Sequence, residues 1–535
     1  MLVQLFFVLV LFCNCALSGR VPLRRPKLPG IPKVEVSDLE ASNAHLRARD
    51  LPPYDTVYYF DQLIDHDDPS KGTFKQRYWH TAEFYEAGGP IILMNAGEVD
   101  ASDYYGYVTN RTINGVVAQQ FGGAAIVLEH RYFGESNPYP NLNVDSLKYQ
   151  TVAQTIEDHV YFAQNVVLPQ DNGDAVGPDK APWILIGGSY PAGQWPRQLF
   201  YTGSTCFSTD ESVNRHPDIF WIGYASSAVV QVQLDFWQYY EPIRENMPKN
   251  CSADVEAVIA YVDGVFTSND TQSQRKIQRM FGFSSNLDVA QALRWDLWTW
   301  QDLQPNTGPG AAFYQFCDAL EVKNGVSASE NGWGVDNALS AWARCLVADD
   351  CYLDCVDDDG SLRRPPVPAA VPDKQVIPQE LEARADYPVG DTYRSWFWLE
   401  CNEIEESLDG PPIGQGGIVS RINRWQDDLV SRMRDHLSRS VLYDADRINA
   451  LYGGWGVKNT RLFFANGKRD PWREGTISAV NSTAVSTDDQ PIGLSNGFHC
   501  TDLVVALAAP DNTVVAVQDS FLVYVEKWLP GFVAK

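Results

Sequence analysis

Between about residues 58 and 227, short apolar runs alternate with longer segments of helical periodicity. Four runs rich in aliphatic residues predict buried strands, and they cover residues 90–97, 124–131, 183–189 and 219–227. Residues 147–167, between the second run and the third, repeat apolar side chains at approximately helical spacing and predict a crossover helix. Strands that alternate with helices in this way are typical of parallel βαβ units, so we expect an α/β fold.

The pattern changes between residues 235 and 439. Long amphipathic segments, most of the cysteines and a proline-rich loop at 363–378 replace the alternation, and they predict a mainly helical insertion. A strand-like run at 460–467 then resumes the first pattern. We therefore expect an α/β core in two parts, 55–234 and 440–535, interrupted by a helical cap.

The chain begins with an apolar run of roughly 15 residues, shorter than the roughly 20 that a membrane-spanning helix needs. The run ends on small residues, which predicts a secretory signal over 1–18, with an N-terminal anchor as the alternative. Residues 19–54 form a leader whose basic, proline-rich first part we expect not to pack. Arg24 and Arg25 mark either a processing site or a plain flexible leader. We expect a secreted protein, with a vacuolar or lysosome-like compartment as the alternative.

Composition narrows the class of partner. The 535 residues include 68 acidic and 42 basic side chains, which give a formal net charge of −26. A surface this acidic argues against nucleic acid and anionic membranes as partners. The sequence has no glycine-rich phosphate loop, no EF-hand and no zinc-type cysteine spacing, so we expect no cofactor and no metal. The oligomeric state stays open.

The cysteines and the glycosylation triplets both fit export. Two of the ten cysteines lie in the predicted signal, and the other eight predict up to four disulfides of undetermined pairing: Cys206, Cys251, Cys317, Cys345, Cys351, Cys355, Cys401 and Cys500. Four Asn-Xaa-Ser/Thr triplets predict glycosylation at Asn110, Asn250, Asn269 and Asn481.

A serine follows the third predicted strand in the stretch GGSYPAG, residues 187–193. Ser189 therefore stands between a strand and a plausible helix, which is the arrangement of a nucleophile elbow, and Gly187 supplies a small neighbour. For this stretch alone, an ordinary Gly-Gly-Ser loop is the alternative. Pro191 removes one backbone N–H, but the expected oxyanion donor is the amide of Tyr190, and proline is tolerated in the first turn of a helix.

Chain order restricts the residues that could act with Ser189. In α/β hydrolases the three catalytic residues follow one another as serine, acid and histidine. Asp470 lies directly after the strand-like run 460–467, and His499 is the only histidine after it. Taken singly, Asp470 could cap the turn before Pro471, and His499 could be a surface residue. Their joint order at strand ends favours a Ser189–Asp470–His499 triad.

Motifs spread along both halves of the predicted core carry a resemblance to a known family. These motifs are FDQLIDHDDPSKGTFKQRYW, AGEV, EHRYFGES, GGSY, ASSAVV, NGKRDPWR and GFHCTDL. In them the chain resembles the serine peptidase family of lysosomal prolyl carboxypeptidase and dipeptidyl peptidase II. Within that family it resembles the secreted fungal acid prolyl endopeptidases most. The resemblance implies an α/β-hydrolase core with a helical cap inserted before the last catalytic strands. It also implies hydrolysis of peptides on the carboxyl side of proline, with the triad on the three residues that chain order selects.

The remaining site residues follow from these roles. The oxyanion donors are expected to be the amide of Tyr190 and one amide near Gly97 or Glu98. The Glu98 side chain is either a ligand for a substrate amine or a buried structural acid. Trp472, two residues after the acid, is expected to wall a proline pocket. Further candidates for this pocket are Trp396 and Trp398, for which plain core is the alternative.

Two other functions fit the same fold. One is a carboxylesterase, because a fold does not fix the substrate, and the other is a catalytically impaired homologue that binds peptides. Whether the peptidase acts as an endopeptidase, a carboxypeptidase or a dipeptidyl peptidase depends on the geometry of the cleft.

Overall fold

The computed structural model describes residues 30–34, 39–193, 218–347, 387–404, 407–424 and 445–535. The predicted signal, Arg24, Arg25, the proline-rich loop and three of the cysteines (Cys206, Cys351 and Cys355) lie outside these ranges. Within them, no helix combines the length and the apolar character that crossing a membrane requires.

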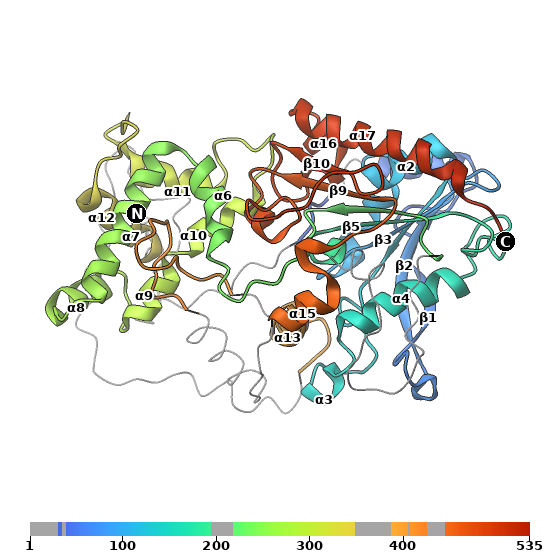
Figure 1. Cartoon of the computed structure of the whole chain (residues 1–535), viewed down its shortest axis with the longest axis horizontal. Coiled ribbons are helices and arrows are strands. Elements are labelled where there is room, and N and C mark those ends of the chain that lie inside the picture. Colours follow the sequence, from blue (N-terminus) through green and yellow to red (C-terminus); the bar gives the residue numbers. More distant parts are fainter. Residues whose placement is uncertain (1–29, 35–38, 194–217, 348–386, 405–406, 425–444) are drawn as a thin grey trace, which may run out of the picture.

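The core is one eight-stranded sheet (Figure 1). Its strand order is β1-β2-β4-β3-β5-β6-β9-β10. β2 runs antiparallel to both of its neighbours, and every other adjacent pair is parallel. The strands are β1 (Tyr58–Leu63), β2 (Thr73–Thr81), β3 (Ile91–Asn95), β4 (Ala124–Leu128), β5 (Trp183–Gly188), β6 (Ile222–Ser226), β9 (Leu462–Gly467) and β10 (Ile492–Ser495). The four strands predicted from apolar runs are confirmed as β3, β4, β5 and β6.

Helices cover both faces of the sheet. Ile184 and Ile186 of β5 pack in one cluster with α2 (Ile113–Phe121) and α17 (Asn512–Trp528), whereas Leu185 packs with α4 (Val152–Asn165) on the other face. Both faces of β5 are therefore buried, which explains its continuous apolar run. The predicted crossover helix is confirmed as α4. This layered sheet, with its strand order, is the α/β-hydrolase core that the sequence predicts.

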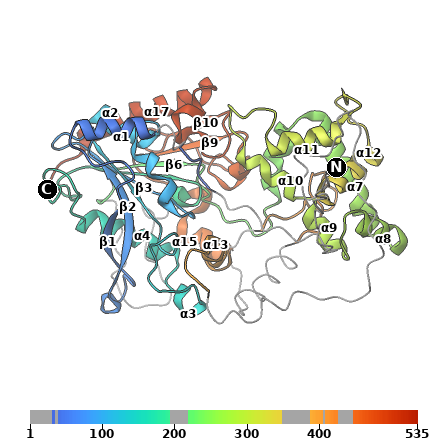
Figure 2. The same cartoon turned by 180° about the vertical axis from the view of Figure 1, so that it is seen from behind.

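A helical body lies beside the sheet, on the left in Figure 1 and on the right in Figure 2. Between β6 and β9, the described residues add no strand to the large sheet. They form α6 (Glu241–Asn246), α7 (Lys249–Phe266), α8 (Thr271–Met280), α9 (Asn286–Ala292), α10 (Trp295–Trp298), η6 (Thr299–Asp302), α11 (Ala312–Glu321), α12 (Val335–Val347) and a two-residue-per-strand hairpin β7 (Val322–Lys323) and β8 (Val326–Ser327). The composition break near residue 235 therefore marks a real change of architecture.

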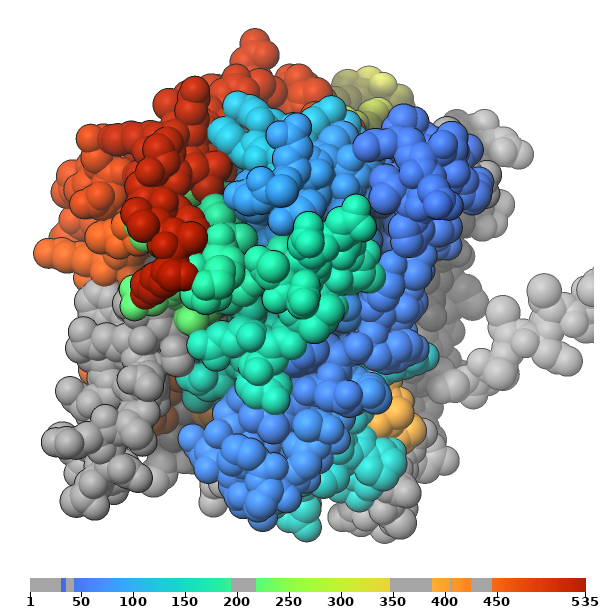
Figure 3. Space-filling view, turned by 90° about the vertical axis from the view of Figure 1, so that its right-hand side faces the viewer, coloured from blue at the N-terminus to red at the C-terminus, as the bar shows by residue number. Residues whose placement is uncertain are grey.

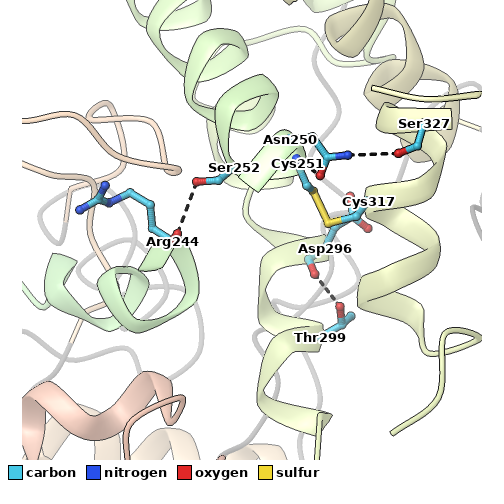
Figure 4. The surroundings of a disulfide bond; sticks show 8 residues. All are labelled: Arg244, Asn250, Cys251, Ser252, Asp296, Thr299, Cys317 and Ser327. Carbon is cyan, nitrogen blue, oxygen red and sulfur yellow. Dashed lines mark hydrogen bonds between the residues drawn. A yellow bond between two sulfur atoms is a disulfide. The ribbon is translucent and has the colours of Figure 1, made fainter. Parts of the chain in front are cut away.

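A disulfide between two described cysteines ties this helical body together (Figure 4). Cys251 of α7 bonds Cys317 of α11, 66 residues further along the chain. Cys500 is buried, and its sulfur forms no disulfide. The expectation of up to four disulfides from eight cysteines is therefore too high by at least one. The sulfur of Cys500 instead packs in the core against Gly188, at the end of β5.

Residues 387–404 belong to the core side, whereas residues 407–424 pack against the helical body, where Asn423 donates to the carbonyl of Ala290 at 3.0 Å. Ser395 of α13 (Thr392–Leu399) donates to the carbonyl of Tyr132 at 2.7 Å, and the Trp398 indole donates to the carbonyl of Gln150 at 3.1 Å. α13 is followed by the π-helical turn η8 (Glu400–Ile404), and α15 (Ala445–Tyr452) lies near both in Figure 1. The described part of the predicted cap thus divides into a separate helical body and a shorter segment packed on the sheet layer.

Part of the leader packs on the core, contrary to expectation. Ile31 and Val34 are about one-twentieth exposed and join the cluster that contains α2 and α17. The carbonyl of Pro32 accepts a hydrogen bond of 2.6 Å from Tyr107. The prediction failed because burial of the two apolar side chains on either side of Pro32 outweighs the local basic and proline-rich composition. α1 (Leu39–Ala48) follows, with Leu46 fully buried.

The other chain end is also fixed on the surface. In Figure 3 the red C-terminal segment lies against the green-teal segment that precedes β5. The Lys535 amide donates to the carbonyl of Asp179 at 2.8 Å, and the Lys180 ammonium donates to the carbonyl of Lys535 at 2.7 Å. The predicted glycosylation sites Asn110, Asn269 and Asn481 are exposed, and Asn250 is half-buried.

Candidate active site

Ser189 occupies a sharp turn at the carboxyl end of β5. Its φ is +61°, a left-handed conformation that costs a residue with a side chain about 1–2 kcal/mol, and residues 189–193 continue as helix. Gly188 and Gly193 allow the close approach that this turn needs. A Cβ atom on Gly188 would lie 2.6 Å from side-chain atoms of Ile31 and Leu503, and one on Gly193 would lie 2.3 Å from the carbonyl oxygen of Val229. This is the geometry of a nucleophile elbow.

Asp470 and His499 form a buried pair. Asp470 follows β9 and caps the short helix η10 (Pro471–Gly475), where its Oδ1 accepts the backbone N–H of Trp472 at 2.9 Å. The same oxygen lies 2.9 Å from Nδ1 of His499, in the loop after β10. Burial alone would lower the pKa of His499, but the neighbouring Asp470 carboxylate outweighs it and holds that pKa well above its ordinary value. The pair therefore favours an imidazolium once the ring accepts a proton.

The loop that carries His499 meets the turn that carries Ser189. A Cβ atom on Gly188 would lie 3.1 Å from the sulfur of Cys500, so the residue before Ser189 meets the residue after His499. Oγ of Ser189 and Nε2 of His499 are both buried, and neither has a hydrogen-bond partner among the described residues. Catalytic hydrogen bonds are often long in enzymes without substrate, so an unpaired serine and imidazole at this place suit a site that closes on substrate.

The two predicted donors after β3 differ in what they already bind. The N–H of Gly97 donates to Oδ1 of Asn95 at 2.8 Å, which removes it as a free oxyanion donor. The alternative in the prediction, the amide of Glu98, remains. A Cβ atom on Gly97, where φ is +83°, would lie 2.8 Å from Cγ of Pro191. The ring of Pro191 therefore packs directly on the loop that carries the Glu98 amide.

The side chain of Glu98 is 1% exposed, and its Oε1 has no hydrogen-bond partner among the described residues. Burial raises the pKa of Glu98 to about 8, against the opposing effects of its own backbone N–H and of His499. At neutral pH and below, this carboxyl is therefore protonated and uncharged, which suits a buried acid better than a ligand for a charged amine.

The three predicted pocket tryptophans lie in three different surroundings. Trp396 meets Tyr190 edge to face, with ring centroids 5.3 Å apart. Trp472 packs against Tyr239 at 5.2 Å, and its indole N–H donates to Oε1 of Gln301 at 2.8 Å. Trp398 lies in a separate cluster with Tyr132. Trp396 therefore contacts the residue after Ser189, and Trp472 donates its backbone N–H to Asp470. Trp398 packs with Tyr132 instead.

Several polar residues that support the site escaped sequence analysis. The Asp502 carboxylate accepts hydrogen bonds from Tyr224 at 2.6 Å and Ser226 at 2.9 Å, and it ties the His499 loop to the end of β6. Asn95 donates to Nε2 of His159 at 2.6 Å, and burial lowers the pKa of that histidine to about 3, so the ring is neutral and accepts. No spacing in the sequence marks these residues, because their partners lie far away along the chain.

The strand order, the left-handed serine at the end of β5 and the buried acid–histidine pair place the protein in the class of α/β hydrolases. A family profile described as serine carboxypeptidase S28 matches residues 62–304. A serine protease of the fungus Bipolaris victoriae, vicPa, is 32% identical over 514 residues, which cover 91% of this chain and 92% of that protein. The chain belongs to the serine carboxypeptidase S28 family, and it is a hydrolase of the serine peptidase type.

More distant relatives span nearly the same length. The lysosomal Pro-X carboxypeptidase of mouse is 22% identical, and the match covers 89% of this chain and 90% of that protein. A probable extracellular serine carboxypeptidase of Arthroderma benhamiae is 26% identical over 85% of this chain and 64% of that protein. Among solved structures, an acetylester hydrolase from Corynebacterium glutamicum matches 88% of this chain and is matched over 95% of its own length, at 11% identity with a TM-score of 0.33.

Proposed function

We propose that the protein is a secreted peptidase that cleaves peptide bonds on the carboxyl side of proline, with Ser189, His499 and Asp470 as its catalytic triad. The observation that carries the proposal is the buried contact of 2.9 Å between Asp470 and Nδ1 of His499, on a loop that meets the elbow of Ser189 and leaves Nε2 unpaired among the described residues. An acid bound to one ring nitrogen fixes the tautomer and leaves the other nitrogen as a base.

In this mechanism Nε2 of His499 takes the Ser189 proton as Oγ attacks the scissile carbonyl carbon. Asp470 keeps the imidazole oriented and stabilises its charged form. His499 then gives the proton to the leaving amine, and an acyl-enzyme on Ser189 remains. A water molecule, activated by the same nitrogen, hydrolyses the acyl-enzyme and restores the serine.

The oxyanion of each tetrahedral intermediate would accept hydrogen bonds from the amides of Tyr190 and Glu98. Tyr190 is the residue after the nucleophile, where this fold carries one donor, and Glu98 lies on the loop after β3, where it carries the other. Pro191 supports this arrangement, because its ring packs on Gly97 and thereby braces the second donor.

Two observations support the proposed specificity for proline: the name of a relative and the aromatic side chains near the proposed triad. The mouse relative is named a Pro-X carboxypeptidase. In this chain, the proposed aromatic surfaces for a compact proline ring are Trp396, which packs on Tyr190, and Trp472, two residues after Asp470. Secretion rests on the predicted signal, on the Cys251–Cys317 disulfide and on the exposed glycosylation triplets at Asn110, Asn269 and Asn481.

Parallel assays test the proposal. Chromogenic peptides ending in proline or in alanine, and a short-chain ester, are offered to the wild type and to Ser189→Ala between about pH 4 and 9, because the base must be neutral and Asp470 raises the pKa of His499 above its ordinary value. The proposal expects turnover of the proline peptide, little turnover of the alanine peptide and none by the variant. Preference for the ester would establish the carboxylesterase, and binding without turnover would establish the impaired homologue.

A further inference from the structure

A short segment of the helical body, Trp300–Gln304, contacts both loops of the candidate active site. Trp300 and Leu303 are 1% exposed, and the segment lies between the two loops that carry Asp470 and His499. Three of its side chains form hydrogen bonds to those loops. Side chains of the helical body therefore help the sheet to position the loops that carry Asp470 and His499.

On the acid side, the segment holds both flanks of Asp470. The Trp300 indole N–H donates to the carbonyl of Arg469 at 2.7 Å, directly before the acid. Gln301 accepts the indole N–H of Trp472, two residues after the acid, at 2.8 Å. The acid loop is thus fixed from the helical body on either side of its carboxylate.

On the histidine side, Gln304 completes a ring of hydrogen bonds around His499. Its Nε2 donates to the carbonyl of His499 at 3.2 Å, and its Oε1 accepts the hydroxyl of Thr501 at 2.7 Å. The same hydroxyl oxygen accepts the N–H of Phe498 at 2.9 Å. One side-chain amide therefore connects the residues before and after the histidine through both of its polar ends.

The histidine loop needs such support because its backbone is strained. Cys500 has a φ of +53°, which residues with side chains adopt at a cost of about 1–2 kcal/mol. The N–H of Cys500 donates to Ser227 at 3.0 Å, and the N–H of Arg469 donates to the carbonyl of Gly497 at 3.0 Å, so the end of β6 and the acid loop both hold the histidine loop. Strained backbone persists only when several surrounding contacts fix it, and Gln304 adds two such contacts from the helical body.

We infer that Gln304 is a positioning residue for His499, through which the helical body keeps the imidazole aimed at Ser189. The inference rests on the proposed triad. It goes beyond the triad because it makes the catalytic geometry depend on an inserted domain that contributes no reacting atom. Gln304 acts on the rate of the chemical step and leaves substrate affinity unchanged.

The test measures the rate at which a fluorophosphonate reagent modifies Ser189, which needs an activated serine but no proline pocket. The variants are Gln304→Ala, Thr501→Val and their combination. Thr501→Ser keeps the hydroxyl, and Gln272→Ala changes an exposed glutamine on α8 as the matched control. Thermal unfolding of each variant and the kcat and KM for the best substrate are measured alongside.

We expect Gln304→Ala and Thr501→Val each to slow labelling and kcat by about 10- to 100-fold, since a misplacement near 1 Å costs up to about 100-fold. KM stays within about twofold, because ground-state binding is untouched. The double variant is hardly slower than either single one, because both remove the same link. Thr501→Ser and Gln272→Ala keep the wild-type rate.

A pH profile adds a readout that mere loss of packing would not move. Gln304→Glu keeps an acceptor for Thr501 but can donate to the His499 carbonyl only while its carboxyl is protonated. Its rate relative to wild type should therefore rise as the pH falls towards the ordinary pKa of glutamate, about 4.3.

The outcomes separate the two claims. If wild type is not labelled at Ser189, the proposed triad is wrong. If wild type is labelled and Gln304→Ala or Thr501→Val keeps its rate within about twofold, a difference near 0.4 kcal/mol, the positioning role is wrong. A loss carried by KM alone also overturns that role. Should Gln304→Ala fail to fold, Thr501→Val, which conserves volume, carries the same decision.

Discussion

Gly97→Ala is the substitution whose effect the geometry predicts most sharply. The new Cβ atom would lie 2.8 Å from Cγ and 3.2 Å from Cδ of Pro191, and the backbone there has a φ of +83°. The proline ring cannot move far, because residues 189–193 form the turn that carries Ser189. The loop after β3 must therefore shift, and with it the amide of Glu98.

The expected loss follows from the role of that amide. Losing one oxyanion donor costs about 2.7–4 kcal/mol, which is about 100- to 1,000-fold in kcat. The unfavourable φ adds about 1 kcal/mol against stability, without affecting the rate. Gly88→Ala is the matched control, because Gly88 has a φ of +88° and open space around its Cβ position. It carries the backbone cost alone.

Pro191→Ala tests the cause. Alone, it should change kcat by no more than about tenfold, or 1.4 kcal/mol, because Pro191 supplies no catalytic hydrogen bond. Combined with Gly97→Ala, it removes the colliding ring atoms and should recover at least about tenfold of the lost rate, the coupling expected of residues in direct contact. The measurement is the steady-state kcat of wild type, Gly97→Ala, Gly88→Ala, Pro191→Ala and the double variant. Equal rates for Gly97→Ala and Gly88→Ala, or no recovery in the double variant, would refute the reasoning.

Two further predictions concern stability. Burial, reinforced by Asp254, raises the pKa of Glu321 from 4.5 to about 8, so the folded chain holds a proton that the unfolded chain releases from about pH 4.5 upward. The free energy of unfolding therefore falls as the pH rises from 4.5 to 8, and Glu321→Gln should flatten that slope, by at most about 1.4 kcal/mol per pH unit before solvent screening, in urea titrations at several pH values. An unchanged slope would contradict this assignment. Replacing both Cys251 and Cys317 by alanine should lower the free energy of unfolding by about 4 kcal/mol for a loop of this length, with kcat unchanged; a loss of kcat in the folded variant would count against a separate helical body.

The elements that sequence analysis found are those whose signal is local. The run 183–189 is apolar at every position because β5 is buried on both faces, and such a run stands out without any knowledge of its neighbours. The order of Ser189, Asp470 and His499 was also readable, because the topology of the fold places strand ends in a fixed sequence along the chain. The contact between Asp470 and His499 follows from the parallel pairing of β9 and β10, whose ends carry the two loops.

The features that sequence analysis missed depend on contacts between distant segments. Gln304 lies 195 residues from the His499 carbonyl that it binds, and nothing in its local sequence distinguishes it from other glutamines. Ile31 and Val34 sit in a basic, proline-rich stretch whose composition predicts exposure, and only the apolar surface around Tyr107 reveals their packing. Gly97 lost its expected donor role because Asn95, two residues earlier, already accepts its N–H.

The most direct test of the central claim is to trap the acyl-enzyme. A proline-rich peptide is mixed with the protein and quenched in acid within a turnover, and mass spectrometry maps the adduct. The proposal expects one acyl group on Ser189, with proline as the residue esterified to its oxygen, and no adduct in Ser189→Ala. An adduct on another residue, or one that ends in residues other than proline, would contradict it.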